Sequence, residues 1–245
     1  MISYNNTSIT VRHDLQQAHE RAWQRIANAG TWLDAEKRLE IARETRQARS
    51  CRFCASRKKA LSPYAQTGSH EQISNLAPIE VDVVHRVVTD SGRITSSWVS
   101  SLLAEGIEDA CYVEMVSVVT QVLVVDDFCL ALGTSLQPLP EPEPGIPTRA
   151  RPVSAIREGA FVPWIPHSEV GEDSKLFGTG LVPNMHRAMS LVPDAVRAAQ
   201  DLMAAHYMPY ALVPIYGDAD HNRALSKSQM ELLAARVSFL NDCFY

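Results

Sequence analysis

Residues 33–54 read LDAEKRLEIARETRQARSCRFC, a stretch that opens on a helix-capping aspartate and closes on a Cys-x-x-Cys motif. Asp34 is of a residue type preferred at helix N-caps, so we expect a helix from there to about Arg49. Cys51 and Cys54 follow it. This spacing at the start of a further helix places both sulfurs on one turn, where free N–H groups and the helix dipole stabilise a thiolate. The motif therefore predicts a dithiol site.

The same arrangement returns near the other end of the chain. Residues 225–245, LSKSQMELLAARVSFLNDCFY, begin with a leucine and the helix-capping Ser226, and Cys243 is as far from that leucine as Cys51 is from Leu33. The two segments match in their capping residue, in the spacing of their apolar residues and in the position of their cysteine. We therefore predict that the chain carries the same cysteine-tipped helix twice, with the second copy ending before its Cys-x-x-Cys is complete.

Apolar periodicity and capping signals predict helices along the rest of the chain. Pro78 stands where a first-turn proline belongs, Thr95 is a capping residue, and Gly133 can end the helix that precedes it. The valine-rich run before Gly133 is too long for a strand and lacks strict alternation, so we expect it to be helical. The expected fold class is all-α, with helices at about residues 11–29, 34–49, 78–88, 95–104, 108–132, 184–191, 194–207 and 226–242.

A proline-rich stretch divides the chain. Residues 138–152, PLPEPEPGIPTRARP, contain six prolines, which exclude a regular helix and are typical of a semi-rigid linker. We therefore expect one helical repeat over residues 1–137 and a second, related repeat over residues 153–245.

Composition excludes several classes of function. The net charge of -5 and the pI of about 5.9 provide no basic face for nucleic acid. The first residues lack the basic start and apolar core of a secretory signal. The most apolar stretch, residues 110–125, contains Glu114 and Gln121 and is too short and too polar to span a bilayer. Five sparse cysteines do not resemble a disulfide framework. We expect a cytoplasmic protein with reduced thiols and no nucleic-acid or membrane partner.

The second cysteine helix resembles the active-site helix of the AhpD-like alkylhydroperoxidase and carboxymuconolactone decarboxylase superfamily. Redox members of that family show Glu, eleven residues, Cys-x-x-Cys, three residues and His. Glu231 and Cys243 have this spacing, and residues 182–188, VPNMHRA, look like the segment that introduces the domain in peroxidase-related members. The resemblance implies AhpD-like helical domains in which the second cysteine attacks peroxide, the first resolves it as a disulfide, and Glu and His relay protons. Cys243 would then be the resolving cysteine and Glu231 part of the relay.

On this resemblance, the attacking residue and the histidine of the second copy would follow Tyr245. We expect the reading frame to continue with a UGA codon at position 246, decoded as selenocysteine, because a selenol is largely ionised at neutral pH. The alternatives are a frameshift, a nonsense mutation or a cut of the chain. The nucleotide sequence decides between them.

The first copy departs from the family pattern. Leu39 stands where Glu231 would be, Lys58 stands where the histidine should be, and Glu40 and Glu44 are off register. Lys58 follows the second cysteine by four residues on the same helical face, where its charge could lower the thiol pKa without relaying protons. We therefore expect the first dithiol to be redox-active without being a competent peroxidase.

A Cys-x-x-Cys can also be one half of a zinc site. Zinc needs a second pair of ligands, and His70 and His85 are neither paired nor spaced like a ligand motif. We therefore expect no metal and no cofactor. Cys111 and Cys129 lie on an apolar segment and are expected to be core residues.

Together these features favour a thiol-dependent (hydro)peroxidase or disulfide oxidoreductase of the AhpD-like type. Its expected partners are a hydroperoxide substrate, a thiol reductant and further copies of the chain, because members of the family usually form homo-oligomers. The alternatives are a non-redox carboxymuconolactone decarboxylase-like enzyme and a helical scaffold with structural cysteines. The expected catalytic residues are Cys51, Cys54, Glu231 and Cys243, with Lys58, Glu40 and Glu44 as secondary candidates.

Overall fold

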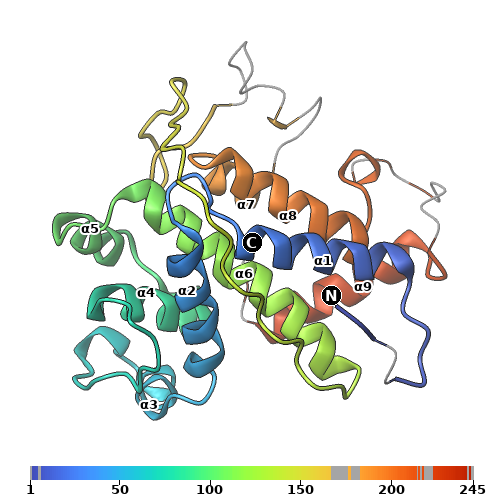
Figure 1. Cartoon of the computed structure of the whole chain (residues 1–245), viewed down its shortest axis with the longest axis horizontal. Helices are drawn as coiled ribbons and strands as arrows, with labels where there is room; N and C mark the ends of the chain where they lie inside the picture. The colour runs from blue at the N-terminus through green and yellow to red at the C-terminus, as the bar shows by residue number, and fades with distance from the viewer. Residues whose placement is uncertain are drawn as a thin grey trace.

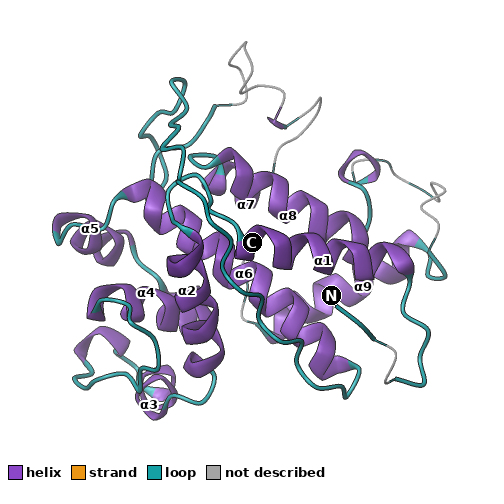
Figure 2. Cartoon of the chain, in the orientation of Figure 1, coloured by secondary structure: helices purple, strands orange, loops and turns teal. Residues whose placement is uncertain are grey.

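The computed structural model describes residues 2–4, 7–166, 176–177, 183–213, 215, 217, 223–241 and 243. Within these ranges the chain is helical and contains no β-strand, only an isolated bridge between Ile156 and Trp164 (Figure 2). The all-α expectation is confirmed for this part of the chain. Val182 and Tyr245, which enter the expectations above, lie outside it. The helices are α1 (His13–Ala27), α2 (Ala35–Ala48), α3 (Arg52–Lys59), α4 (Pro78–Asp90), α5 (Ser96–Ala104), α6 (Asp109–Ala131), α7 (Asn184–Met189), α8 (Pro193–His206) and α9 (Lys227–Leu240).

The helices begin at the capping residues that the sequence indicated. The side chain of Asp34 accepts the N–H of Lys37 at 2.7 Å and starts α2. Thr95 caps α5 in the same way. Pro78 occupies the first position of α4, where its missing N–H removes no helical hydrogen bond.

The two cysteine-tipped helices agree in local structure. Helices α2 and α9 are both 14 residues long, and in each case a cysteine lies three positions after the last helical residue. Ser226 and Gln229 form a reciprocal capping box at the start of α9. Their surroundings differ, because α2 is packed into the core whereas α9 leaves Leu232 and Phe239 more than two-thirds exposed. The relation of the two halves as AhpD-like repeats stays a prediction.

Helix α6 forms the centre of the molecule and packs against α1, α2, α4 and α8 (Figure 1). Its residues Val118, Val119, Val122 and Val125 are fully buried. The helix is apolar on several faces because it has neighbours on several sides. The valine-rich run is therefore helical, as expected. No helix in the described part of the chain is long and apolar enough to cross a membrane.

The proline-rich stretch runs along the surface of this helical body without forming a helix. Its Pro138 carbonyl accepts the indole N–H of Trp23 at 2.7 Å, and the N–H of Glu143 donates to Ala27 at 2.7 Å. Beyond it, α8 packs back onto α1 and α6, so both halves contribute to one hydrophobic core. Helices α3, α4 and α5 lie at the opposite end from α8 and α9 (Figure 1).

Candidate metal centre

Two cysteines and two histidines converge where α3 meets α4. Cys51 is the N-cap of α3 and Cys54 lies in its first turn, while His70 is in the following loop and His85 is in α4. Each residue offers one ligand atom, and the four atoms all lie within 4.8 Å of one another. The fold therefore brings two histidines, 16 and 31 positions after Cys54, to the cysteine pair.

The distances within the cluster suit a single tetrahedral ion. Cys54 Sγ lies 3.1 Å from His85 Nδ1 and 3.4 Å from His70 Nδ1, and Cys51 Sγ lies 3.8 Å from His70 Nδ1. Zinc bonds of about 2.3 Å to sulfur and about 2.0–2.1 Å to nitrogen would separate these two atom types by roughly 3.6 Å. The observed sulfur–nitrogen distances scatter around that separation.

A carboxylate lies behind each histidine. His85 Nε2 is 2.7 Å from Glu44, and His70 Nε2 is 3.0 Å from Asp82. Because a carboxylate accepts a hydrogen bond, each Nε2 is the N–H donor and each Nδ1 is left for ligation. Carboxylate–histidine pairs of this kind are typical of metal ligands, since they fix the ring and raise its basicity.

The two histidines differ in their protonation in the absence of a metal. Burial lowers the pKa of His85 and outweighs its hydrogen bond to Glu44. Burial also acts to lower the pKa of His70, but hydrogen bonds to Asp82 and to the two sulfurs raise it to about 9. A proton on His70 therefore faces the sulfurs at the position that a cation would take.

The sulfur of Cys51 is stabilised as a thiolate. Burial acts to raise the pKa of Cys51, but backbone hydrogen bonds from Cys54 and Glu71 and the ring of His70 hold it below its ordinary value. The N-cap position accounts for the first of these bonds, because the opening N–H groups of a helix have no partner within it. The thiolate is the form that binds a metal or acts as a nucleophile.

The charges around the cluster favour a divalent cation. Burial acts to raise the pKa of both Glu44 and Asp82, but their hydrogen bonds lower it, so both are ionised. Arg57 pairs with Asp82 at 2.7 Å and Arg86 does so at 3.0 Å. If both cysteines bound a metal as thiolates and both histidines were neutral, two thiolates and two carboxylates would face two arginines, which leaves two negative charges. A divalent ion would make this largely buried group neutral.

Helix α3 depends on this cluster for its place in the fold. Its buried residues are Cys54 and Arg57, neither of which provides a large apolar face. The comparably short α5 instead buries Trp98, Val99 and Leu102. A short helix is marginal on its own and relies on packing. The polar cluster is therefore the main attachment of α3 to α4.

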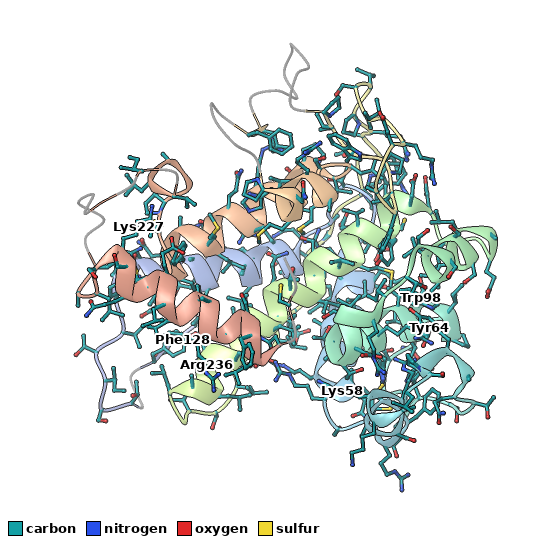
Figure 3. The ribbon with its side chains drawn as sticks, turned by 180° about the vertical axis from the view of Figure 1, so that it is seen from behind. Lys58, Tyr64, Trp98, Phe128, Lys227 and Arg236 are labelled. Atoms are coloured by element: carbon teal, nitrogen blue, oxygen red, sulfur yellow. The ribbon has the colours of Figure 1, made fainter. Side chains whose placement is uncertain are left out.

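The secondary candidates of the first copy differ in how they lie relative to the cluster. Lys58 is exposed at the edge of the molecule (Figure 3), and the buried cation of α3 is Arg57. Glu40 accepts the backbone N–H of Asn75 at 2.7 Å. Glu44, which is off register in the family pattern, is in direct contact with the cluster through His85.

The sequence argument against a metal site is corrected by this geometry. His70 and His85 do form a pair in space, although 15 positions separate them and no compact ligand motif contains both. The loop after α3 brings the first histidine back over the cysteines, and α4 carries the second. They are the first two histidines after the Cys-x-x-Cys, but four more follow them, so sequence order alone would not have indicated this pair.

In the described part of the chain, Glu231 and Cys243 of the second copy share no hydrogen bond or ion pair. Glu231 is exposed on α9 and bonds with Tyr207, whose pKa is raised by burial and then by this carboxylate. Cys243 is exposed beyond the end of α9. Cys129 is fully buried, as expected, while Cys111 is half-buried with a pKa that burial raises to about 11.

The chain matches no protein-family model, no curated protein and no solved structure. The resemblance to the AhpD-like superfamily therefore rests on the residues quoted above, and the site is interpreted from its own chemistry.

Proposed function

We propose that Cys51, Cys54, His70 and His85 bind one zinc ion and that this ion cross-links α3 to α4. The supporting observation is the convergence of four ligand atoms within 4.8 Å. Two sulfurs and two imidazole nitrogens at tetrahedral spacing suit Zn²⁺, whereas Mg²⁺ and Ca²⁺ prefer oxygen ligands.

The role that fits this site best is structural. Cys51, Cys54 and His85 are 2%, 2% and 0% exposed, so solvent has little access to the cluster. A catalytic zinc ion keeps one position open for water or substrate, whereas four protein ligands close the coordination sphere. The ion would hold a weakly packed helix and its following loop in place.

Metal analysis of the purified chain tests the proposal. We expect about one zinc ion per chain, the content of a single closed site. Cys54→Ser and His85→Gln should remove most of the bound zinc, whereas Cys243→Ser changes an exposed cysteine outside the cluster and should leave the zinc content intact. A chain that lacks zinc after purification, and then takes up neither Zn²⁺ nor Co²⁺ on titration, would overturn the proposal.

A second candidate function, the thiol peroxidase chemistry of the resembled family, uses the same residues without the metal. It is favoured by a hydrogen-bonded chain in which Glu44 lies 2.7 Å from His85 and His85 lies 3.1 Å from Cys54. Cys54 would pass its proton to His85 and attack a hydroperoxide, forming an S–O bond and breaking the O–O bond, with the alcohol leaving as it takes up that proton. The thiolate of Cys51 would then attack the sulfenic acid sulfur to form the disulfide, the departing hydroxide would take up a proton to become water, and a thiol reductant would restore both cysteines.

Comparison of the zinc-loaded and zinc-free chains separates the two functions. The zinc-free chain should lose two thiols on treatment with an organic hydroperoxide, and Cys51→Ser should prevent disulfide formation. The zinc-loaded chain should keep both cysteines reduced, because coordination to the metal makes their thiolates poorer nucleophiles. Unchanged thiols in the zinc-free chain would exclude the redox candidate and leave the structural one standing.

A further inference from the structure

A second site lies apart from the metal centre, in a cavity of about 620 Å³ between α1, α6 and α8. This volume is within the range of small-molecule sites. Arginines from three helices line it: Arg21 and Arg25 from α1, Arg38 from α2 and Arg197 from α8. Arg38 is the most buried of them, whereas Arg21 and Arg197 are about half exposed or more.

Two of these arginines keep unused donors. Arg25 donates from Nε to Gln121 and from Nη1 to Asp201, each at 2.8 Å, and Arg38 donates from Nη1 to Glu114 at 2.8 Å. The buried atoms Arg25 Nη2 and Arg38 Nε have no hydrogen-bond partner in the described part of the chain. Buried guanidinium donors normally bond to an acceptor. Arg25 and Arg38 both line the cavity, so these two buried donors next to it lack an acceptor.

The charge of the lining has the sign that an anion requires. Four arginines face three carboxylates, those of Glu114, Asp194 and Asp201, which leaves one positive charge in excess. Burial lowers the pKa of Arg38, and the nearby charge of Arg25 acts in the same direction. The two guanidinium groups are thus close enough to repel each other, and an anion between them would relieve that repulsion.

The inner wall of the cavity is rigidly built. Glu114 accepts the backbone N–H of Trp32 at 2.7 Å as well as the Arg38 guanidinium. A Cβ atom at Gly30 would come within 1.8 Å of the Glu114 carboxylate and 1.9 Å of Arg38 Nη1. The absence of a side chain at Gly30 therefore makes room for this ion pair and fixes Arg38 at the cavity wall.

We propose that this cavity binds a small organic carboxylate between Arg25 and Arg38. One excess positive charge matches a monoanion, and two free N–H donors match the two oxygens of a carboxylate group. The apolar side chains of Val192, Ala195 and Ala198 also line the cavity and would contact the body of the ligand.

Calorimetric titration of the full, zinc-loaded chain with benzoate tests this inference. We expect benzoate to bind with a Kd below about 1 mM, and Arg25→Gln to weaken binding about tenfold, the effect of losing one charge-assisted hydrogen bond. Arg38→Met should abolish benzoate binding if this variant folds. If Arg38→Met does not fold, the affinity of Arg25→Gln decides the test. Arg43→Gln, which removes an exposed arginine outside the cavity, should leave the Kd unchanged.

Three outcomes would overturn the inference. They are the absence of benzoate binding, equal affinity in Arg25→Gln, and preferential binding of inorganic phosphate. The result is independent of the proposed zinc centre because none of the four metal ligands lines the cavity.

Discussion

Glu44 is fully buried beneath the candidate metal centre and accepts hydrogen bonds from His85 and from the backbone N–H groups of Ile73 and Ser74. Glu44→Gln keeps the shape of the side chain but removes the charge that makes His85 a stronger ligand. We expect the zinc affinity to fall by about 10–100-fold. Competition with a chromophoric chelator measures it, with Glu36→Gln on the exposed side of α2 as the matched control. Equal affinities in the two variants would contradict the role assigned to Glu44.

Gly30 carries a second prediction at the scale of single residues. Gly30→Ala would place a methyl group within 2 Å of both Glu114 and Arg38 and so separate a buried ion pair. We expect a loss of about 3–5 kcal/mol of unfolding free energy, the usual result of breaking such a pair. Guanidinium denaturation measures the loss. Gly92→Ala is the control, because a Cβ atom there meets nothing within 4 Å; a similar small effect in both variants would show that the pair can move freely.

Helix α3 carries the prediction at the scale of elements. Because α3 buries only Cys54 and Arg57, removal of zinc should leave it held mainly by the Arg57–Asp82 ion pair and by the hydrogen bonds of Arg93, which is a weaker attachment. We expect a strong chelator to increase amide hydrogen exchange over residues 52–77 while exchange in α6 stays slow. Helix α5 is the internal control, since it keeps Trp98 and Leu102 in the core. Unchanged protection of α3 after complete zinc removal would mean that the metal does not hold it.

The elements themselves could largely be predicted from local sequence, whereas the site could not. Asp34, Pro78 and Thr95 mark helix starts because capping depends on neighbouring backbone groups. The position of His70 depends on the path of a long loop, which no capping rule determines. Cys51 and Cys54 could therefore be predicted as a candidate dithiol site, but the two histidines that lie against them became visible only in the fold.

At the scale of the whole molecule, local sequence signals likewise did not predict the contacts between the two halves of the chain. The proline-rich stretch correctly indicated a break in helical structure, but nothing local indicated that α8 would pack against α1. That packing brings Asp201 to Arg25 and builds the arginine-lined cavity. It also places His206 against His19, with 2.7 Å between their Nε2 atoms.

The His19–His206 contact makes the stability of the whole molecule depend on pH. His19 is fully buried, bonds through Nδ1 to the Tyr4 hydroxyl at 2.5 Å, and packs against Phe128, which Figure 3 labels on α6. Burial, and then the charge of His206, lower the pKa of His19 to about 3. Burial likewise lowers the pKa of His206 to about 4, with the charge of Arg12 acting in the same direction. Both rings are therefore neutral in the folded protein near neutral pH.

Below about pH 6.5, the unfolded chain binds a proton on His19 that the folded chain does not bind, so acidification should favour unfolding. The expected loss for His19 alone is about 1.4 kcal/mol of unfolding free energy per pH unit, with a smaller share from the more exposed His206. Guanidinium denaturation at about pH 6.5 and about pH 5 measures this slope. His19→Gln should make it shallower, whereas His13→Gln, at the exposed start of the same helix, should not. Acid would release zinc equally from the unchanged chain and from both variants, so a difference in the pH dependence of their unfolding free energy reports on His19 alone. Identical pH dependence in all three proteins would contradict the role assigned to His19.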